Sequence, residues 1–220
     1  MKNILENRRH TDKIKYVLFL FGKRLIDIFT SCISLILLSP LFLFISILIK
    51  IEDRGKVFFS HSRVGYNNEK IKLYKFRSMK ETKLDLQEVL SKEEYEEYLK
   101  EFKLNNDPRR TKVGLVLRKT SLDELPQLLN ILKGDMSLVG PRPIVEEEFR
   151  NYTVAEKERL LSVKPGLTGY WQAYARNNAS YQMGERQRME LYYVDHASIM
   201  LDIKILLKTV QTVFTGKGAK

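Results

Sequence analysis

One apolar segment limits what this chain can fold into more than any other feature. Residues Ile28–Ile49 form a run of 22 residues without a charged side chain. A helix of that length crosses the hydrocarbon core of a bilayer, which is about 30 Å thick. The run differs from a cleavable signal peptide, because it is long, begins well inside the chain and lacks a small-residue cleavage site after it. We therefore expect this segment to associate with a membrane.

A Ser39-Pro40 pair interrupts the run near its middle. Proline has no N–H group and its ring clashes with the carbonyl four residues earlier, which costs about 3 kcal/mol or more inside a helix. Sharp helix bends commonly lie at proline. The Ser39 hydroxyl can donate a hydrogen bond to a carbonyl that the break leaves free. The pair therefore predicts a sharp bend in the membrane segment.

Basic residues flank the run on both sides. Those before it are Arg8, Arg9, Lys13, Lys15, Lys23 and Arg24, and those after it are Lys50, Arg54, Lys56, Arg63, Lys70, Lys72, Lys75 and Arg77. A spanning helix should carry its Lys and Arg excess at one end, on the cytoplasmic side. The flanks instead favour both ends on the cytoplasmic face, so we predict a re-entrant helix hairpin over residues 23–51. A spanning helix with a proline kink remains the alternative. We expect Asp27 to pair with Lys23 or Arg24.

The whole chain of 220 residues has a formal net charge of +11. This excess indicates an acidic partner, and nucleic acid, anionic lipid headgroups and phosphorylated small molecules all qualify. The only cysteine, Cys32, excludes an internal disulfide, and the three histidines lie too far apart in sequence for a ligand-spaced zinc site. We predict a basic, amphipathic N-terminal segment over 1–22, the membrane hairpin over 23–51 and a cytoplasmic catalytic domain over 52–220.

A short helix is predicted after the sequence Thr120-Ser-Leu-Asp-Glu-Leu-Pro-Gln. Leucines at positions 125, 128, 129 and 132 have the spacing of one helical face. Gly134 favours an end to the helix, and Pro126 belongs among its first positions, whose N–H groups have no partner inside the helix. Asp123 or Glu124 therefore lies at the helix start, where free N–H groups and the positive dipole end favour carboxylate and phosphate.

Two adjacent carboxylates in this basic region indicate phosphate chemistry. Asp123 and Glu124 lie between Arg118 and Arg142. A site where a phosphate must be held and attacked needs cations, which the two arginines supply. The alternative is that Ser121-x-x-Glu124 is an ordinary capping box with Asp123 as a first-turn acid. A helix that began there would carry the following proline too deep.

The remaining sequence predicts an α+β fold that is mostly helical. Two short strands, Val57–Phe59 and Ile71–Arg77, form a small β-hairpin around a turn at Gly65-Tyr-Asn-Asn. Helices are expected over 84–104, 146–161 and 199–214, and the last is an amphipathic helix for the membrane interface or for the core. Turns are expected at Gly140-Pro-Arg-Pro and at Pro165-Gly-Leu-Thr-Gly, where small residues would let the backbone approach a ligand closely.

Short segments along the chain together carry a family resemblance. In chain order they are Lys23-Arg-Leu-Ile-Asp, Leu38-Ser-Pro, Val57-Phe-Phe, Arg63-Val-Gly, Tyr74-Lys-Phe-Arg-Ser-Met, Arg118-Lys-Thr-Ser-Leu-Asp-Glu-Leu-Pro-Gln, Gly140-Pro-Arg-Pro, Pro165-Gly-Leu-Thr-Gly, Tyr193-Val-Asp and Leu201-Asp-Ile. This set resembles the bacterial sugar transferases, the small monotopic polyprenyl-phosphate phosphoglycosyl transferases. The resemblance covers nearly everything after about residue 22.

The resemblance implies a membrane reaction between two phosphorylated substrates. A sugar 1-phosphate passes from a UDP-sugar to polyprenyl (undecaprenyl) phosphate, and UMP is released in the first step of surface glycan assembly for exopolysaccharide, capsule or lipopolysaccharide. The enzyme would be monotopic on the cytoplasmic face of the inner membrane, with Mg²⁺ as cofactor and lipids of that leaflet as partners. The resemblance admits a homodimer and implies no nucleic-acid partner.

The resemblance also assigns roles to residues of this chain. Asp123 would attack the β-phosphate, form a covalent phosphosugar intermediate and bind Mg²⁺, with Glu124 as its catalytic partner. Arg118 and Arg142, whose planar guanidinium groups suit phosphate, would bind substrate. Lys75 and Arg77 would do the same, although ordinary strand-surface cations are the alternative. Ser39 and Pro40 would form the hairpin of the re-entrant helix.

Two other functions remain open at this point. In one, the same substrates react directly in a ternary complex, and Asp123 only binds magnesium. In the other, the chain is a basic membrane-anchored binding module without catalysis. The module would explain the charge, but it would not explain why two acids lie among the cations.

Overall fold

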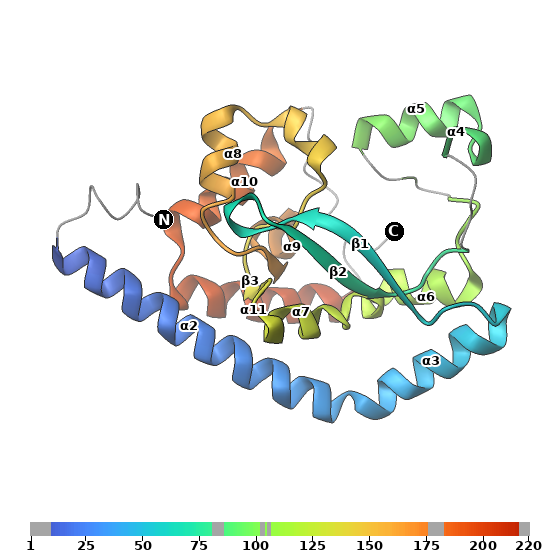
Figure 1. The fold of residues 1–220 in the computed structure, drawn as a ribbon, viewed down its shortest axis with the longest axis horizontal. Helices are drawn as coiled ribbons and strands as arrows, with labels where there is room; N and C mark the ends of the chain where they lie inside the picture. Colours follow the sequence, from blue (N-terminus) through green and yellow to red (C-terminus); the bar gives the residue numbers. More distant parts are fainter. Residues whose placement is uncertain (1–9, 81–85, 102–103, 105–106, 176–182, 216–220) are drawn as a thin grey trace.

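A computed structural model describes residues 10–80, 86–101, 104, 107–175 and 183–215 (Figure 1). Two long helices, α2 (His10–Leu37) and α3 (Ser39–Asp53), form an open V along one edge, and the other elements lie on its inner side. The described chain is mostly helical with two small sheets, which confirms the predicted α+β class. The N-terminal residues 1–9 of the predicted basic segment lie outside the described residues.

The predicted bend in the apolar segment is confirmed. The axes of α2 and α3 differ by 59° across a break at Leu38. The Ser39 hydroxyl donates a hydrogen bond of 2.8 Å to the carbonyl of Ile36, which is the carbonyl that Pro40 leaves without a partner. Within the described residues no single helix is long and apolar enough to cross a membrane, whereas α2 and α3 pass that test together as a bent pair.

The outer sides of α2 and α3 are apolar and exposed. The exposed apolar side chains there are Ile14, Val17, Leu18, Phe21, Leu25, Ile26, Ile28, Phe29, Ile33, Ile36, Leu37, Leu43, Phe44, Ile47 and Ile51. The inner side of α3 is buried through Ile45 and Ile49. Soluble proteins rarely expose so many neighbouring apolar side chains, so this surface is suited to an apolar environment.

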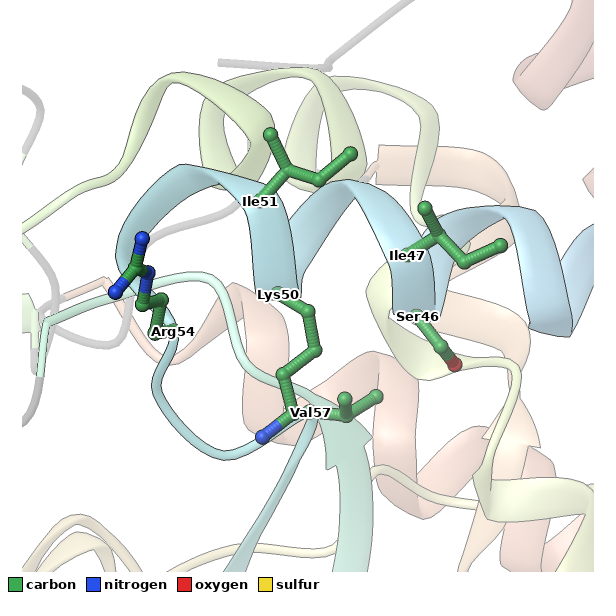
Figure 2. Close-up of a pocket in the computed structure, with 6 residues that line it drawn as sticks. All are labelled: Ser46, Ile47, Lys50, Ile51, Arg54 and Val57. Carbon is green, nitrogen blue, oxygen red and sulfur yellow. The ribbon is translucent and has the colours of Figure 1, made fainter.

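The C-terminal end of α3 borders a shallow cavity of about 500 Å³ (Figure 2). Its lining residues are Ser46, Ile47, Lys50, Ile51, Arg54 and Val57. Arg54 follows the helix in a left-handed conformation, with φ of 57°, and its N–H donates to the carbonyl of Lys50. The cavity therefore combines apolar walls with two cations at the point where the chain leaves the bent helix pair.

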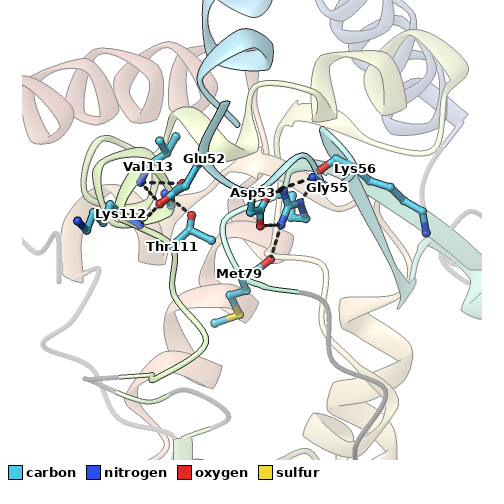
Figure 3. A network of polar contacts seen from close by, with 10 residues as sticks. Glu52, Asp53, Gly55, Lys56, Met79, Thr111, Lys112 and Val113 are labelled. Atoms are coloured by element: carbon cyan, nitrogen blue, oxygen red, sulfur yellow. Dashed lines mark hydrogen bonds and ion pairs between the residues drawn. The ribbon is translucent and has the colours of Figure 1, made fainter. Parts of the chain in front are cut away.

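Two acids at the end of α3 attach it to the rest of the fold (Figure 3). The Glu52 carboxylate accepts hydrogen bonds from the N–H groups of Lys112 and Val113, the first residues of α6 (Lys112–Thr120). The Asp53 carboxylate forms a bidentate ion pair with Arg77, which is only 5% exposed. A carboxylate is favourable at a helix N-terminus because free N–H groups and the dipole meet it there.

Helix α2 is attached through three charged side chains that lie within five residues. Lys23 pairs with Asp202 at 2.5 Å, and Arg24 donates to the carbonyls of Ile131 and Leu132. Asp27 is 3% exposed and accepts a hydrogen bond of 2.9 Å from the N–H of Leu138. The expected pairing of Asp27 with Lys23 or Arg24 is therefore wrong, because distant parts of the chain supply better partners for all three.

The predicted β-hairpin is confirmed. Strands β1 (Phe58–Val64) and β2 (Lys70–Phe76) pair antiparallel, with Phe58 opposite Phe76. The turn between them contains a short 3₁₀ helix, Tyr66–Asn68, in which two asparagines have positive φ. Asparagine tolerates this left-handed conformation better than most residues, which explains its use in the turn.

A second, two-stranded sheet replaces one of the predicted turns. Strand β3 (Ser137–Val139) pairs in parallel with β4 (Gly166–Thr168), so the segment Pro165-Gly-Leu-Thr-Gly contributes a strand. Its small residues allow close contact between backbones: a Cβ atom on Gly166 would lie 2.1 Å from the nitrogen of Gly140, and one on Gly169 would lie 2.2 Å from the oxygen of Gly140. The small residues thus bring these two segments of backbone together, and their close approach to a ligand stays a prediction.

Several predicted helices are present with different boundaries. The stretch 84–104 holds α4 (Leu86–Val89) and α5 (Lys92–Glu101), and 146–161 holds a 3₁₀ helix, η3 (Glu146–Asn151), and α8 (Val154–Leu160). The remaining helices are η2 (Leu122–Glu124), α7 (Gln127–Lys133), α9 (Tyr170–Ala175), α10 (Glu185–His196) and α11 (Ile199–Thr215). Helix α11 confirms the amphipathic prediction, with Ile205 fully buried and Leu207 67% exposed.

Replacing both Ser39 and Pro40 with leucine should straighten α2 and α3 into one helix, because the lost hydrogen bond is restored. With spin labels at positions 22 and 51 on a Cys32→Ser background, we expect the distance to lengthen by roughly 5 Å, given a rise of about 1.5 Å per residue. Pulsed electron paramagnetic resonance measures this distance. The control, Ser46→Leu, removes a hydroxyl inside α3 and should leave the distance unchanged. An unchanged distance in the double variant would show that tertiary contacts alone bend the chain.

Candidate active site

The chain reverses direction between α6 and α7, and the candidate carboxylates lie in this turn. Helix α6 ends at Thr120; the next residue, Ser121, has a left-handed backbone with φ of 61°, and η2 follows directly. The Ser121 side chain does not cap η2, and the Glu124 side chain turns to Lys75 instead. The capping-box alternative is therefore wrong. Helix α7 begins after Pro126 and ends at Gly134, as the leucine spacing predicts.

Asp123 lies against the apolar core that holds the bent helix pair. Its side chain is buried, with the residue 6% exposed. Its neighbours in sequence, Leu122 and Leu125, pack against a cluster that contains Ile45 and Ile49 of α3. The apolar side of this turn therefore faces helix α3, and this packing fixes the backbone on either side of the carboxylate.

Lys75 of β2 contacts both candidate carboxylates. Its Nζ lies 2.6 Å from Oε1 of Glu124 and 4.0 Å from Oδ2 of Asp123. The side chains of Lys75 and Glu124 are 22% and 31% exposed, so this ion pair forms the accessible part of the site. Lys75, Asp123 and Glu124, three of the residues predicted for the site, thus come together from a strand and a helical turn.

Burial raises the pKa of the Asp123 carboxyl above its usual value. The positive charge of Lys75 opposes this rise, the adjacent Glu124 carboxylate adds to it, and Arg118 also opposes it. Burial lowers the pKa of Arg118, whereas the field of Asp123 raises it. Arg118 also donates from Nε to the hydroxyl of Ser78 at 3.0 Å. The site therefore holds a carboxylate whose charge depends on neighbouring cations.

The two remaining predicted cations lie in other surroundings. Arg77 donates to the Asp53 carboxylate and to the carbonyl of Lys56. Its guanidinium therefore connects the end of α3 to the residues just before β1. Arg142 follows β3, and its guanidinium lies over the ring of Trp171 at 5.8 Å. A substrate-binding role of either arginine stays a prediction.

A buried charged cluster beside Arg142 was missed from the sequence. Arg186 lies over Trp171 at 4.1 Å and pairs with Glu148 at 3.4 Å, and Arg63 pairs with the same carboxylate at 3.2 Å. Glu190 is 1% exposed and accepts a hydrogen bond from the backbone N–H of Arg142. The spacing of Arg186 and Glu190, one turn apart on a helix, was an available signal, because such pairs share one helical face.

The donor set at Asp123 suits a magnesium ion that is shared with substrate phosphates. Mg²⁺ usually binds through one or two carboxylates together with phosphate oxygens and water. Asp123 and Glu124 provide two carboxylates, and the described part of the chain contains no group of three or more His, Cys, Asp or Glu side chains that could hold a metal alone. These residues therefore fit an ion held jointly by enzyme and substrate.

Replacing Lys75 with methionine should raise the pKa of Asp123 further, because the strongest opposing charge is lost. A ¹³C nuclear magnetic resonance titration of aspartate side chains, with Asp123→Asn used to assign the signal, measures this shift. The control is Lys72→Met, which removes an exposed lysine from the same strand. The same pKa of Asp123 in wild type, Lys75→Met and Lys72→Met would contradict this account of the site.

Comparison with known proteins places this site in a family. A family model described as bacterial sugar transferase matches residues 18–216. The exopolysaccharide production protein ExoY of Rhizobium meliloti (strain 1021) is 46% identical over 201 residues, which cover 90% of this chain and 88% of the relative.

Two longer relatives match over less than half of their own length. The undecaprenyl-phosphate galactose phosphotransferase of Salmonella typhimurium is 44% identical over 202 residues, or 90% of this chain and 42% of the relative. The UDP-N-acetylgalactosamine-undecaprenyl-phosphate N-acetylgalactosaminephosphotransferase of Aeromonas hydrophila is 37% identical over 209 residues, or 92% of this chain and 46% of the relative. The chain therefore belongs to the bacterial sugar transferase family and is an enzyme that transfers a sugar phosphate.

Proposed function

We propose that this chain transfers a sugar 1-phosphate from a UDP-sugar to undecaprenyl phosphate and releases UMP, as the first step of surface glycan assembly. The names of its relatives support these substrates, since they act on undecaprenyl phosphate and on UDP-linked galactose or N-acetylgalactosamine. Membership of a transferase family argues against the binding-module alternative. The observation that carries the proposal is the contact of Lys75 with both Asp123 and Glu124.

Asp123 acts as the nucleophile in this proposal. Its Oδ attacks the β-phosphorus of the UDP-sugar, the bond from that phosphorus to the bridging oxygen breaks, and UMP leaves with the electron pair. An oxygen of undecaprenyl phosphate then attacks the same phosphorus, and the bond to Asp123 breaks. Covalent catalysis thus divides one difficult transfer into two easier steps.

The charges around Asp123 support this role. An incoming phosphate can replace Glu124 as the partner of Lys75, because that ion pair is partly exposed and such pairs contribute little to stability. Glu124 is then available as a second oxygen donor next to Asp123. Arg118 adds positive charge where charge develops in the transition state. Asp123 and Glu124 would hold a magnesium ion together with the diphosphate, and such an ion would supply the remaining charge compensation.

The bent helix pair supports a monotopic position on the cytoplasmic face. Its outer side is apolar, its two ends carry basic residues, and its inner side packs against the turn that holds Asp123. A re-entrant arrangement places both ends in the same leaflet, next to the phosphate of a lipid-linked acceptor. The nucleophile would then lie close to the headgroup layer, where the polyprenyl chain stays in the bilayer.

Asp123→Asn should lower transfer activity by at least roughly a thousandfold without unfolding the protein. Incubation of wild-type enzyme in lipid nanodiscs with a UDP-sugar labelled in the β-phosphate, without acceptor, should attach label to the protein and release UMP. The control is Glu158→Gln, which changes an exposed acid on α8 and should retain both activities. An active wild-type enzyme that never acquires label would favour direct transfer in a ternary complex.

Removal of divalent metal with a chelator should abolish UMP release, because Asp123 would meet the diphosphate without charge compensation. Addition of Mg²⁺ in excess should restore it. The Lys75→Met enzyme should need a higher Mg²⁺ concentration than wild type, since it has lost a cation at the same place. Activity that is insensitive to chelation would remove magnesium from the proposal and leave the role of Asp123 to the labelling experiment.

A further inference from the structure

Arg142 lies in the turn Gly140-Pro-Arg-Pro, and every backbone N–H group of this turn donates a hydrogen bond. Two of its four residues are prolines and have no N–H group. The N–H of Gly140 donates to the carbonyl of Thr168 at 2.9 Å, and the carbonyl of Pro141 accepts from Gly166 at 2.8 Å. The only other N–H in the turn belongs to Arg142, and its partner is a side chain instead of a strand.

That partner is Glu190 of α10. Its Oε2 accepts the hydrogen bond from the Arg142 N–H at 3.1 Å, and the residue is 1% exposed. Its other oxygen, Oε1, is buried without a hydrogen-bond partner among the described residues. A buried carboxylate with one oxygen unpaired is unusual, because burial of a charge without full pairing is costly. The proposed reaction makes no direct use of this carboxylate.

The charged groups that face Glu190 come from several elements. Arg142 lies in the turn after β3, Arg186 lies one turn earlier on α10, and Glu148 lies on η3. Arg63 of β1 neutralises part of the Glu148 charge through their ion pair. Trp171 of α9 lies beneath the guanidinium groups of Arg186 and Arg142. The backbone of Arg142 and its side chain are thus held by one closed cluster.

We propose that Glu190 is a positioning residue for substrate binding: its carboxylate fixes the backbone of Arg142, so that the guanidinium meets the substrate phosphate, and the hold weakens when the carboxylate takes up a proton. This inference rests on the proposed function, because Arg142 is taken there as a phosphate-binding residue. A hydrogen bond to an ionised acceptor is roughly twice as strong as one between neutral groups. Glu190 therefore holds Arg142 more firmly when it is ionised.

Both forms of Glu190 are populated near neutral pH. Burial raises its pKa to about 7, and the charges of Arg186 and Arg142 and the hydrogen bond from the Arg142 N–H limit the rise. Because this pKa lies above the usual value of 4.5, the folded protein binds the proton more tightly than the unfolded chain does. The stability that Glu190 contributes is therefore present below that usual value and is lost as pH rises toward 7.

Glu190→Gln provides a matched test, since glutamine keeps the shape and an acceptor oxygen but carries no charge at any pH. The rate of UMP release against UDP-sugar concentration gives KM and kcat at about pH 6 and about pH 8. In wild type we expect KM to be roughly fivefold higher at the lower pH. We expect kcat to change with pH by the same factor in wild type and in the variants. The glutamine variant should have the higher KM at both pH values. The control is Glu146→Gln, an exposed acid of the same 3₁₀ helix as Glu148.

A lower KM in the variant than in wild type would overturn the proposal, because it would show that the carboxylate merely competes with phosphate for Arg142. Equal KM values in both proteins at both pH values would overturn it as well. If the glutamine variant does not fold, Glu190→Asp takes its place, since it keeps the charge and shortens the reach. The aspartate variant should then retain the step in KM with pH, at a higher KM throughout.

A second measurement does not depend on transfer activity. Thermal unfolding of the protein in nanodiscs between about pH 5 and about pH 8 should show wild type losing stability relative to Glu190→Gln as pH rises toward 7. A purely structural hydrogen bond would instead make the variant less stable than wild type by the same amount at every pH. If wild type transferred no sugar phosphate, the proposed function would fail. Separately, if the stability difference between wild type and Glu190→Gln did not change with pH, the proposed titration of Glu190 would be wrong.

Discussion

The bend at Pro40, where the Ser39 hydroxyl takes over the carbonyl of Ile36, is the constraint on which the other contacts depend. Because the helix pair bends by 59°, both of its arms reach the same segment, residues 112–133, which contains Asp123. Glu52 at the end of α3 binds the first N–H groups of this segment, and Arg24 of α2 binds its last carbonyls. Each charge complements the helix end that it contacts. A straight helix could not make both contacts at once.

The position of Asp123 follows from this double attachment. The two contacts hold the ends of the α6–α7 segment, and Leu122 and Leu125 anchor its middle against α3. The carboxylate is left at the boundary between apolar core and cations, where burial raises its pKa and Lys75 restrains the rise. The same arrangement that fixes Asp123 beside the bent helix pair also makes its charge sensitive to what binds Lys75.

Local chemistry was sufficient to predict several features from the sequence. The bend at Ser39-Pro40, the β-hairpin and the helix that ends at Gly134 each depend on residues close together in the chain. The partner of Asp27 could not be predicted, because it is a backbone N–H more than a hundred residues away. The parallel β3–β4 pair was hidden for a similar reason: each strand has three residues, too few for a recognisable alternation. The cluster of Glu148, Arg186 and Glu190 needed the tertiary fold to bring it around Arg142.

The contact between the backbones of Gly140, Gly166 and Gly169 carries a consequence for sequence change. A single methyl group at Gly166 or Gly169 would overlap main-chain atoms of Gly140, which cannot swing aside as a side chain can. Strand β4 would have to move away from the Gly140-Pro-Arg-Pro turn. Mutations at these glycines would therefore displace the turn that carries Arg142 without changing any charged side chain, and screens for loss of transferase activity should recover them alongside changes at Asp123.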